Sequence, residues 1–137
     1  MKNPELFHKT VGILVKSYFD GTLEHSICGC AVGNLICANM GIDISCFHPS
    51  WNSVFVTTIM CGSEFHINEY RGNAKKQIDS TGYSPYELAL IEKAFESGRL
   101  NNDMFSDLMS VVNALSEIHE ATETEAKQAK ELFTLTA

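Results

Sequence analysis

The sequence predicts an all-α fold, a single-domain bundle of five to six helices over residues 1–137, around a central buried helix at about 26–40. Three observations indicate this. Apolar residues recur three or four positions apart over much of the chain, which is the spacing of one helix face. Capping sequences and glycines stand where such helices would begin and end. The segment 26–40 is apolar or small on every side, as expected for a helix surrounded by others.

The composition is that of one ordinary folded domain. The chain has 137 residues, of which 45% are hydrophobic and 20% charged, and its formal net charge is -7. An acidic chain of this kind is not typical of nucleic-acid binders, which gather Lys and Arg on one face. The first ten residues lack the apolar core of a secretory signal, and the longest near-apolar run, 28–38, is too short to cross a bilayer and contains Asn34. We therefore expect a cytoplasmic protein that binds neither nucleic acid nor membrane.

The first two helices are predicted from their ends. Asn3-Pro4 supplies a cap and a first-turn proline, and Gly21 supplies a left-handed stop after a regular apolar stripe. The second helix, about 26–40, ends before Gly41. Its glycines at 29 and 33 are four residues apart and would let another backbone approach closely.

Residues 42–80 give the weakest pattern. A helix opened by Pro49-Ser50 fits the apolar residues that follow, but the β-branched run "SVFVTTIM" leaves a small β-hairpin within 51–70 as the alternative. We expect exposed loops at Gly72-Asn73 and at 80–82.

The C-terminal half predicts three helices. Ser84-Pro85-Tyr86-Glu87 is a capping box that opens the first of them, which Gly98 should end. An apolar stripe over 104–119 predicts the second. Thr122 to Glu125 is another capping box and opens a short final helix.

One cluster of potential metal ligands occurs in the stretch "HSICGCAVGN" at 25–34. His25, Cys28 and Cys30 are the soft donors that zinc prefers, and three of them within six residues could meet at one ion. A closed site needs a fourth ligand, and no second paired motif supplies it. The competing interpretation, which we favour, treats Cys28 and Cys30 as small apolar residues of a buried helix.

The same cysteines suggest a thiol nucleophile. A helix N-terminus lowers a thiol pKa, so Cys30 or Cys28 could act with His66 and Asn68 in a cysteine-dependent hydrolase. In outline this is similar to papain-like peptidases, where a cysteine opens a buried helix and a histidine follows on a later strand. The sequence "CGCAV" departs from the C-G-x-C-aromatic pattern of those enzymes, which puts the activity in doubt. We therefore lean against an enzyme.

Three segments carry a resemblance to a group of proteins. The strings "CAVGNLI" (30–36), "STGYSPYELALIEKAFESG" (80–98) and "FSDLMSVVNALSEIH" (105–119) resemble those of small uncharacterised proteins from phages and mobile elements of gut bacteria. The resemblance implies a bacterial or phage cytosolic origin, and since no activity is known for such proteins it assigns no catalytic role.

The functional prediction follows from what the sequence lacks. It has no phosphate loop, no complete metal site and no credible catalytic triad. We expect a small helical accessory or regulatory protein that acts by protein–protein interaction or self-association, without a cofactor. Zinc binding through His25, Cys28 and Cys30 is the first alternative, and the hydrolase is the second.

Overall fold

The computed structural model describes residues 1–26, 29–55, 66–97 and 103–135. These residues form α-helices, 3-10 turns and connecting loops, and they contain no strand. The predicted all-α class is therefore confirmed for the described part of the chain. None of the helices described there combines the length and the apolarity that a membrane span requires.

Helix α1 runs over Pro4–Asp20 and has the predicted ends. The Asn3 side chain accepts a hydrogen bond from the Leu6 N–H, and Gly21 takes the left-handed conformation after the last turn. Its buried face packs against α2 and α6. The chain begins close to the end of α6, because the Lys2 N–H donates to the His119 carbonyl.

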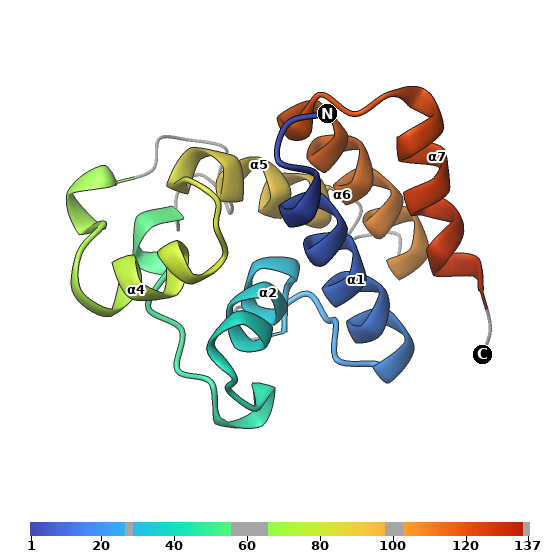
Figure 1. Cartoon of the computed structure of the whole chain (residues 1–137). Helices are drawn as coiled ribbons and strands as arrows, with labels where there is room; N and C mark the ends of the chain where they lie inside the picture. Colours follow the sequence, from blue (N-terminus) through green and yellow to red (C-terminus); the bar gives the residue numbers. More distant parts are fainter. Residues whose placement is uncertain (27–28, 56–65, 98–102, 136–137) are drawn as a thin grey trace.

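Helix α2 runs over Ala31–Met40 and contacts α1, α4 and α5; Figure 1 shows it between α4 and α1. Every residue from 31 to 37 is buried, so the helix lies at the centre of the fold as predicted. Its predicted start near residue 26 is wrong. The cap is Cys30, and the described residues before it form a bend, in which the Glu24 N–H donates to the Gly29 carbonyl.

Two 3-10 turns, η1 (Ile44–Cys46) and η2 (Ile67–Glu69), flank the stretch that the sequence left ambiguous. Residues 52–55 are helical, which agrees with a helix opened at Pro49-Ser50. The described parts of 51–70 contain no strand, so the proposed β-hairpin has no support in 51–55 or 66–70. The rest of that prediction, at 56–65, lies outside the described residues.

Helix α4 (Gly72–Ser80) corrects the prediction of a loop at Gly72-Asn73. The segment has few apolar residues, but Ala74, Gln77 and Ile78 are buried on one face against α2. The Gln77 side chain accepts from the N–H groups of Ser50 and Trp51 and donates to the His48 carbonyl. The helix is thus held by contacts to residues almost thirty positions away.

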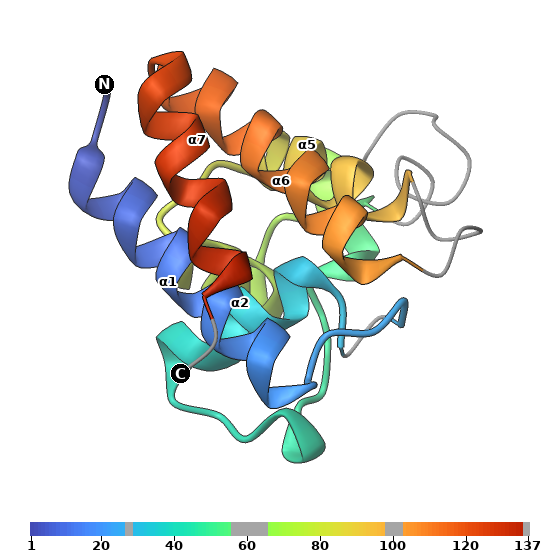
Figure 2. The same cartoon turned by 90° about the vertical axis from the view of Figure 1, so that its right-hand side faces the viewer.

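The remaining helices are α5 (Pro85–Glu96), α6 (Met104–His119) and α7 (Glu123–Glu131), followed by the 3-10 turn η4 (Leu132–Thr134). Both predicted capping boxes are present, at Ser84 and at Thr122, whereas Gly98 lies outside the described residues. Helices α5 and α6 lie side by side, and α7 covers the outer side of α6 (Figure 2). The buried side chains of α1, α2, α4, α5 and α6 meet in one apolar core.

Candidate functional site

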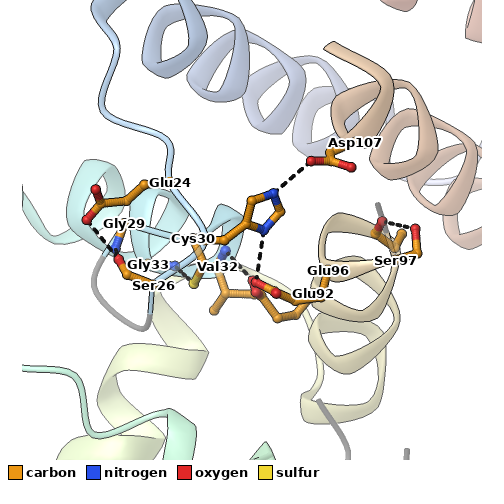
Figure 3. A network of polar contacts seen from close by, with 12 residues as sticks. Glu24, Ser26, Gly29, Cys30, Val32, Gly33, Glu92, Glu96, Ser97 and Asp107 are labelled. Carbon is orange, nitrogen blue, oxygen red and sulfur yellow. Dashed lines mark hydrogen bonds and ion pairs between the residues drawn. The ribbon is translucent and has the colours of Figure 1, made fainter. Parts of the chain in front are cut away.

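A cluster of ionisable side chains lies where the residues before α2 meet α5 and α6 (Figure 3). His25 and Cys30 come from the segment that leads into α2, Glu92 and Glu96 from successive turns of α5, and Asp107 from the first turn of α6. The helical period places residues 92 and 96 on the same face of α5. Residues far apart in the sequence therefore form one polar cluster at the junction of these helices.

Glu92 is fully buried, with 1% of its surface exposed, as is Asp107 of the same cluster. Its Oε1 accepts a hydrogen bond of 3.2 Å from the Val32 N–H, in the first turn of α2. Burial, together with the neighbouring Glu96 carboxyl, raises the pKa of Glu92 from 4.5 to about 8. The bonds from Val32 and Cys30 act in the opposite direction but do not outweigh the burial. At neutral pH the group is therefore mainly a neutral carboxylic acid.

Cys30 is the N-terminal cap of α2. Its Sγ accepts a hydrogen bond of 3.3 Å from the Gly33 N–H, and its thiol also bonds the Glu92 carboxyl. Burial, and next the nearby Glu92, raise the pKa of Cys30 well above its ordinary value. These two effects outweigh the opposite effect of the helix N-terminus, whose N–H groups and dipole lower the pKa of a thiol. The thiol is thus protonated at neutral pH.

His25 connects the cluster to α6. Its Nε2 lies 2.7 Å from Asp107 Oδ2, its Nδ1 lies 3.5 Å from Glu96 Oε1, and its ring stacks on Phe95 with 4.6 Å between centroids. Both ring nitrogens thus face carboxylates from different helices. The imidazole ties the loop before α2 to both α5 and α6.

The structure brings together two of the predicted site residues, His25 and Cys30. Cys28 lies outside the described residues. His66 and Asn68 are exposed at η2, whereas Cys30 is 1% exposed, and the His66 N–H donates to the Val54 carbonyl. The contacts described for Cys30 are with Glu92 and Gly33, so the predicted pairing of Cys30 with His66 and Asn68 gains no support.

The zinc prediction gains no support from the described residues either. Within the ranges 1–26, 29–55, 66–97 and 103–135, no three His, Cys, Asp or Glu side chains are placed to hold a metal ion. His25 already faces two carboxylates, and Cys30 faces Glu92. A zinc site with His25 would require its ring to leave at least one of these contacts.

Sequence reasoning missed Glu92, Glu96 and Asp107. The sequence does contain a sign of two of them. Glu92 and Asp107 occupy buried positions next to the core residues Ile91 and Leu108, where an apolar residue would be expected. A charged residue at a core position must find a polar partner. The identity of that partner depends on how the helices pack, which the sequence does not reveal.

Asn34, also in α2, has a structural role. Its side-chain Oδ1 accepts from the Thr22 hydroxyl at 2.8 Å, and its Nδ2 lies within hydrogen-bond distance of the carbonyls of Thr22, Gly29 and Cys30. The amide is therefore satisfied by the protein itself. It fastens Thr22, Gly29 and Cys30 to the start of α2.

The outer surface carries a second candidate feature, between α5 and α6. Tyr86 and Leu90, one turn apart on α5, are 61% and 37% exposed. Beside Leu90 is a hollow of about 280 Å³. Its walls come from both helices and are formed by Leu90, Lys93, Ala94, Ser97, Ala114 and Glu117. We call Tyr86, Leu90 and this hollow the α5–α6 face.

Comparison with known proteins adds nothing to this geometry, since no family model, curated protein or solved structure matches the chain. The function must therefore be inferred from the described residues.

Proposed function

We propose that this protein works by binding another protein through the α5–α6 face, as a small helical accessory or regulatory protein. The observation that carries the proposal is the exposed Leu90 at the hollow between α5 and α6, with the exposed Tyr86 one turn before it on α5. Exposed aromatic and aliphatic side chains beside a depression are typical of the anchor region of an interface.

The shape and chemistry of the face favour a helical partner. Ala94 of α5 and Ala114 of α6 line the hollow, and their short side chains leave room for an apolar side chain of a partner such as leucine or methionine. Lys93 and Glu117 stand at the same hollow and can pair with charges of the partner. An amphipathic helix with an apolar stripe and flanking charges of both signs fits this description.

The buried polar cluster supports a binding protein better than a hydrolase. A cysteine nucleophile needs a thiolate and a neighbouring base. The environment of Cys30 instead raises its pKa, and both nitrogens of His25 face carboxylates. Zinc binding through His25, Cys28 and Cys30 stays a prediction.

The experiment is a comparison of two matched substitutions in the full chain. Leu90→Glu places a charge on the α5–α6 face, and Leu135→Glu places the same charge on another exposed leucine, 61% exposed after η4. A photo-crosslinking residue at position 86 identifies the bound protein in cells of the native host. We expect Leu90→Glu to abolish the crosslink and Leu135→Glu to keep it, with unchanged circular dichroism for both.

Two results would contradict the proposal. One is a crosslinked partner that persists in Leu90→Glu at wild-type yield. The other is equal loss in both variants, which would mean that added charge and not the α5–α6 face is responsible. Light scattering on the purified protein separates self-association from a different partner, because a self-associating chain should become monomeric only in Leu90→Glu.

A further inference from the structure

We infer that residues 121–135, which contain α7 and η4 and which we call the α7–η4 arm, can leave their own chain and dock in the same place on a second copy, so that two copies exchange arms. This inference does not rest on the proposed function, since residues of α5 and α6 line the hollow of the α5–α6 face and the arm does not.

Few side chains hold the arm to the rest of the molecule. Ala129 is the buried residue of α7, and Phe133 is the buried residue of η4. The Phe133 ring meets the Tyr18 ring of α1 edge-on, with 6.0 Å between centroids, and Figure 2 shows α7 on the outside of the molecule, over α6. Among the described residues, the side-chain hydrogen bonds of the arm join arm residues to each other, as in the capping box of Thr122 and Glu125. Release of the arm therefore breaks mainly apolar contacts.

The joint between α6 and the arm contains a strained residue. Glu120 ends α6 with φ at 54° and ψ at 45°, which is the left-handed region. This region is unfavourable for a residue with a Cβ, and glycine is the usual residue there. Helices α1 and α2 follow that rule, since they end at Gly21 and Gly41. The closed joint thus has a conformational cost that opening would remove.

The sequence of the joint allows it to open into a continuous helix. Residues 120–122 are Glu-Ala-Thr, and neither glycine nor proline occurs between 104 and 131. Glutamate and alanine favour a helix. When Glu120 takes ordinary helical angles, α6 and α7 become one helix and the arm points away from its own chain. The cap at Thr122 is then lost, but the N–H groups that it served bond within the longer helix.

A second copy carries the site that fits an open arm. Opening exposes the Phe133 ring and the surface of Tyr18 that it covers, and water opposes the exposure of both. Two open copies that exchange arms remake these contacts twice and relieve Glu120 in both chains. The loss of freedom on association opposes the exchange, so the exchanged pair should form as the concentration rises.

The test mixes equal amounts of isotope-labelled and unlabelled full-length protein at millimolar concentration and then crosslinks lysines. Lys127 and Lys130 report the arm, and the lysines of residues 1–119 report the body. A closed chain links its arm to its own body, so both halves of a linked peptide pair carry the same isotope. Exchanged arms should give pairs with one labelled and one unlabelled half, in a share that rises with concentration. Leu90→Glu should leave this share unchanged, because a dimer through the α5–α6 face keeps each arm on its own body.

Substitutions at position 120 vary the cost of the closed joint. Glu120→Gly removes that cost in both chains, so it should raise the dissociation constant of the exchanged pair about tenfold or more. Glu120→Gln is the matched control, since it removes the same charge and the ion pair with Lys2 but keeps the Cβ, and it should behave as wild type. Glu120→Val should increase the share of mixed pairs, because a β-branched residue is least suited to the left-handed region.

Mixed pairs that are absent from the wild type at every concentration would overturn the inference, as would an equal share of them in Glu120→Gly and Glu120→Gln. The comparison of these two variants decides by itself if Glu120→Val does not fold. Mixed pairs that disappear in Leu90→Glu would assign them to the α5–α6 face and would also overturn the exchange of arms.

Discussion

The Tyr83 hydroxyl lies 2.8 Å from His119 Nε2, and this contact joins the turn before α5 to the end of α6. The same hydroxyl lies 2.9 Å from the Thr10 hydroxyl of α1, and His119 Nδ1 lies 2.7 Å from the Lys2 carbonyl oxygen. A carbonyl can only accept, so Nδ1 carries a hydrogen. The network satisfies every polar atom of a buried histidine and makes His119 a structural residue.

Tyr83→Phe should destabilise the fold by about 1–3 kcal/mol, because it leaves His119 Nε2 and the Thr10 hydroxyl without their buried partner. Urea denaturation followed by circular dichroism measures the change in unfolding free energy. Tyr86→Phe is the control, since that side chain is 61% exposed and its loss of a hydroxyl should change stability by less than about 0.5 kcal/mol. Equal effects of the two substitutions would show that the Tyr83 network contributes nothing.

Global stability should decrease as pH rises from about 5 to about 8. Folding raises the pKa of Glu92 from 4.5 to about 8, so the folded state binds a proton that the unfolded state has already lost in this range. The stabilisation is fully present below about pH 4.5 and is lost as pH rises through 8. Its size is on the order of 3–5 kcal/mol. Unfolding free energies by urea at a series of pH values measure the slope.

The matched variant for this prediction is Glu92→Gln. Its unfolding free energy should lack most of the slope between pH 5 and pH 8, whereas Glu131→Gln should retain it. A slope of the same size in Glu92→Gln would assign the effect to another group.

Thiol reactivity should separate Cys30 from Cys46. Cys30 is buried and its pKa is raised, whereas Cys46 is exposed in η1. We expect iodoacetamide at pH 7.5 to modify Cys46 at least about tenfold faster than Cys30, as judged by peptide mass spectrometry over time. Faster modification of Cys30 than of Cys46 would instead favour the hydrolase hypothesis.

Removal of metal ions should leave the fold unchanged. Both nitrogens of His25 already face Glu96 and Asp107, so the cluster does not need a cation to hold the imidazole in place. Dialysis against EDTA should shift the thermal midpoint by less than about 1 °C. A larger fall, reversed by added zinc and absent in His25→Gln, would restore the zinc site with Cys28 and Cys30.

Local signals in the sequence predicted much of the fold. Asn3, Ser84 and Thr122 cap their own helices, so the starts of α1, α5 and α7 could be read from a few neighbouring residues. The buried character of α2 followed from its composition. These features depend on contacts within one turn of helix, which sequence patterns record directly.

Other features depend on partners far along the chain, and these were missed. The sequence predicts the start of α2 near residue 26, because cysteine is an unusual N-terminal cap. In the structure Cys30 caps the helix, and Glu92, about sixty residues later, accepts a hydrogen bond from the Val32 N–H in the first turn. Helix α4 has few apolar residues and is anchored by Gln77 to residues 48–51. The sequence predicts only part of the polar cluster. His25 and Cys30 are candidates by residue type, whereas Glu92, Glu96 and Asp107 join them only through the packing of α5 and α6.

Gly12, inside α1, and Gly21, the residue that caps its end, should respond in opposite directions to the same substitution. Gly12 is inside the helix, and apart from its chain neighbours and the nearby backbone of the helix no atom lies within 4 Å of the position that a Cβ would take. Gly12→Ala should therefore raise the unfolding free energy by about 0.5–1 kcal/mol, because alanine has the higher helix propensity. Gly21 ends the helix with φ at 73°, a conformation that costs an L-residue roughly 1–2 kcal/mol. Gly21→Ala should lower the unfolding free energy by about that amount. Denaturation of both variants in the same buffer measures the pair. A rise in both would mean that the left-handed end of α1 does not require glycine, and a fall in both would mean that position 12 does not accept alanine.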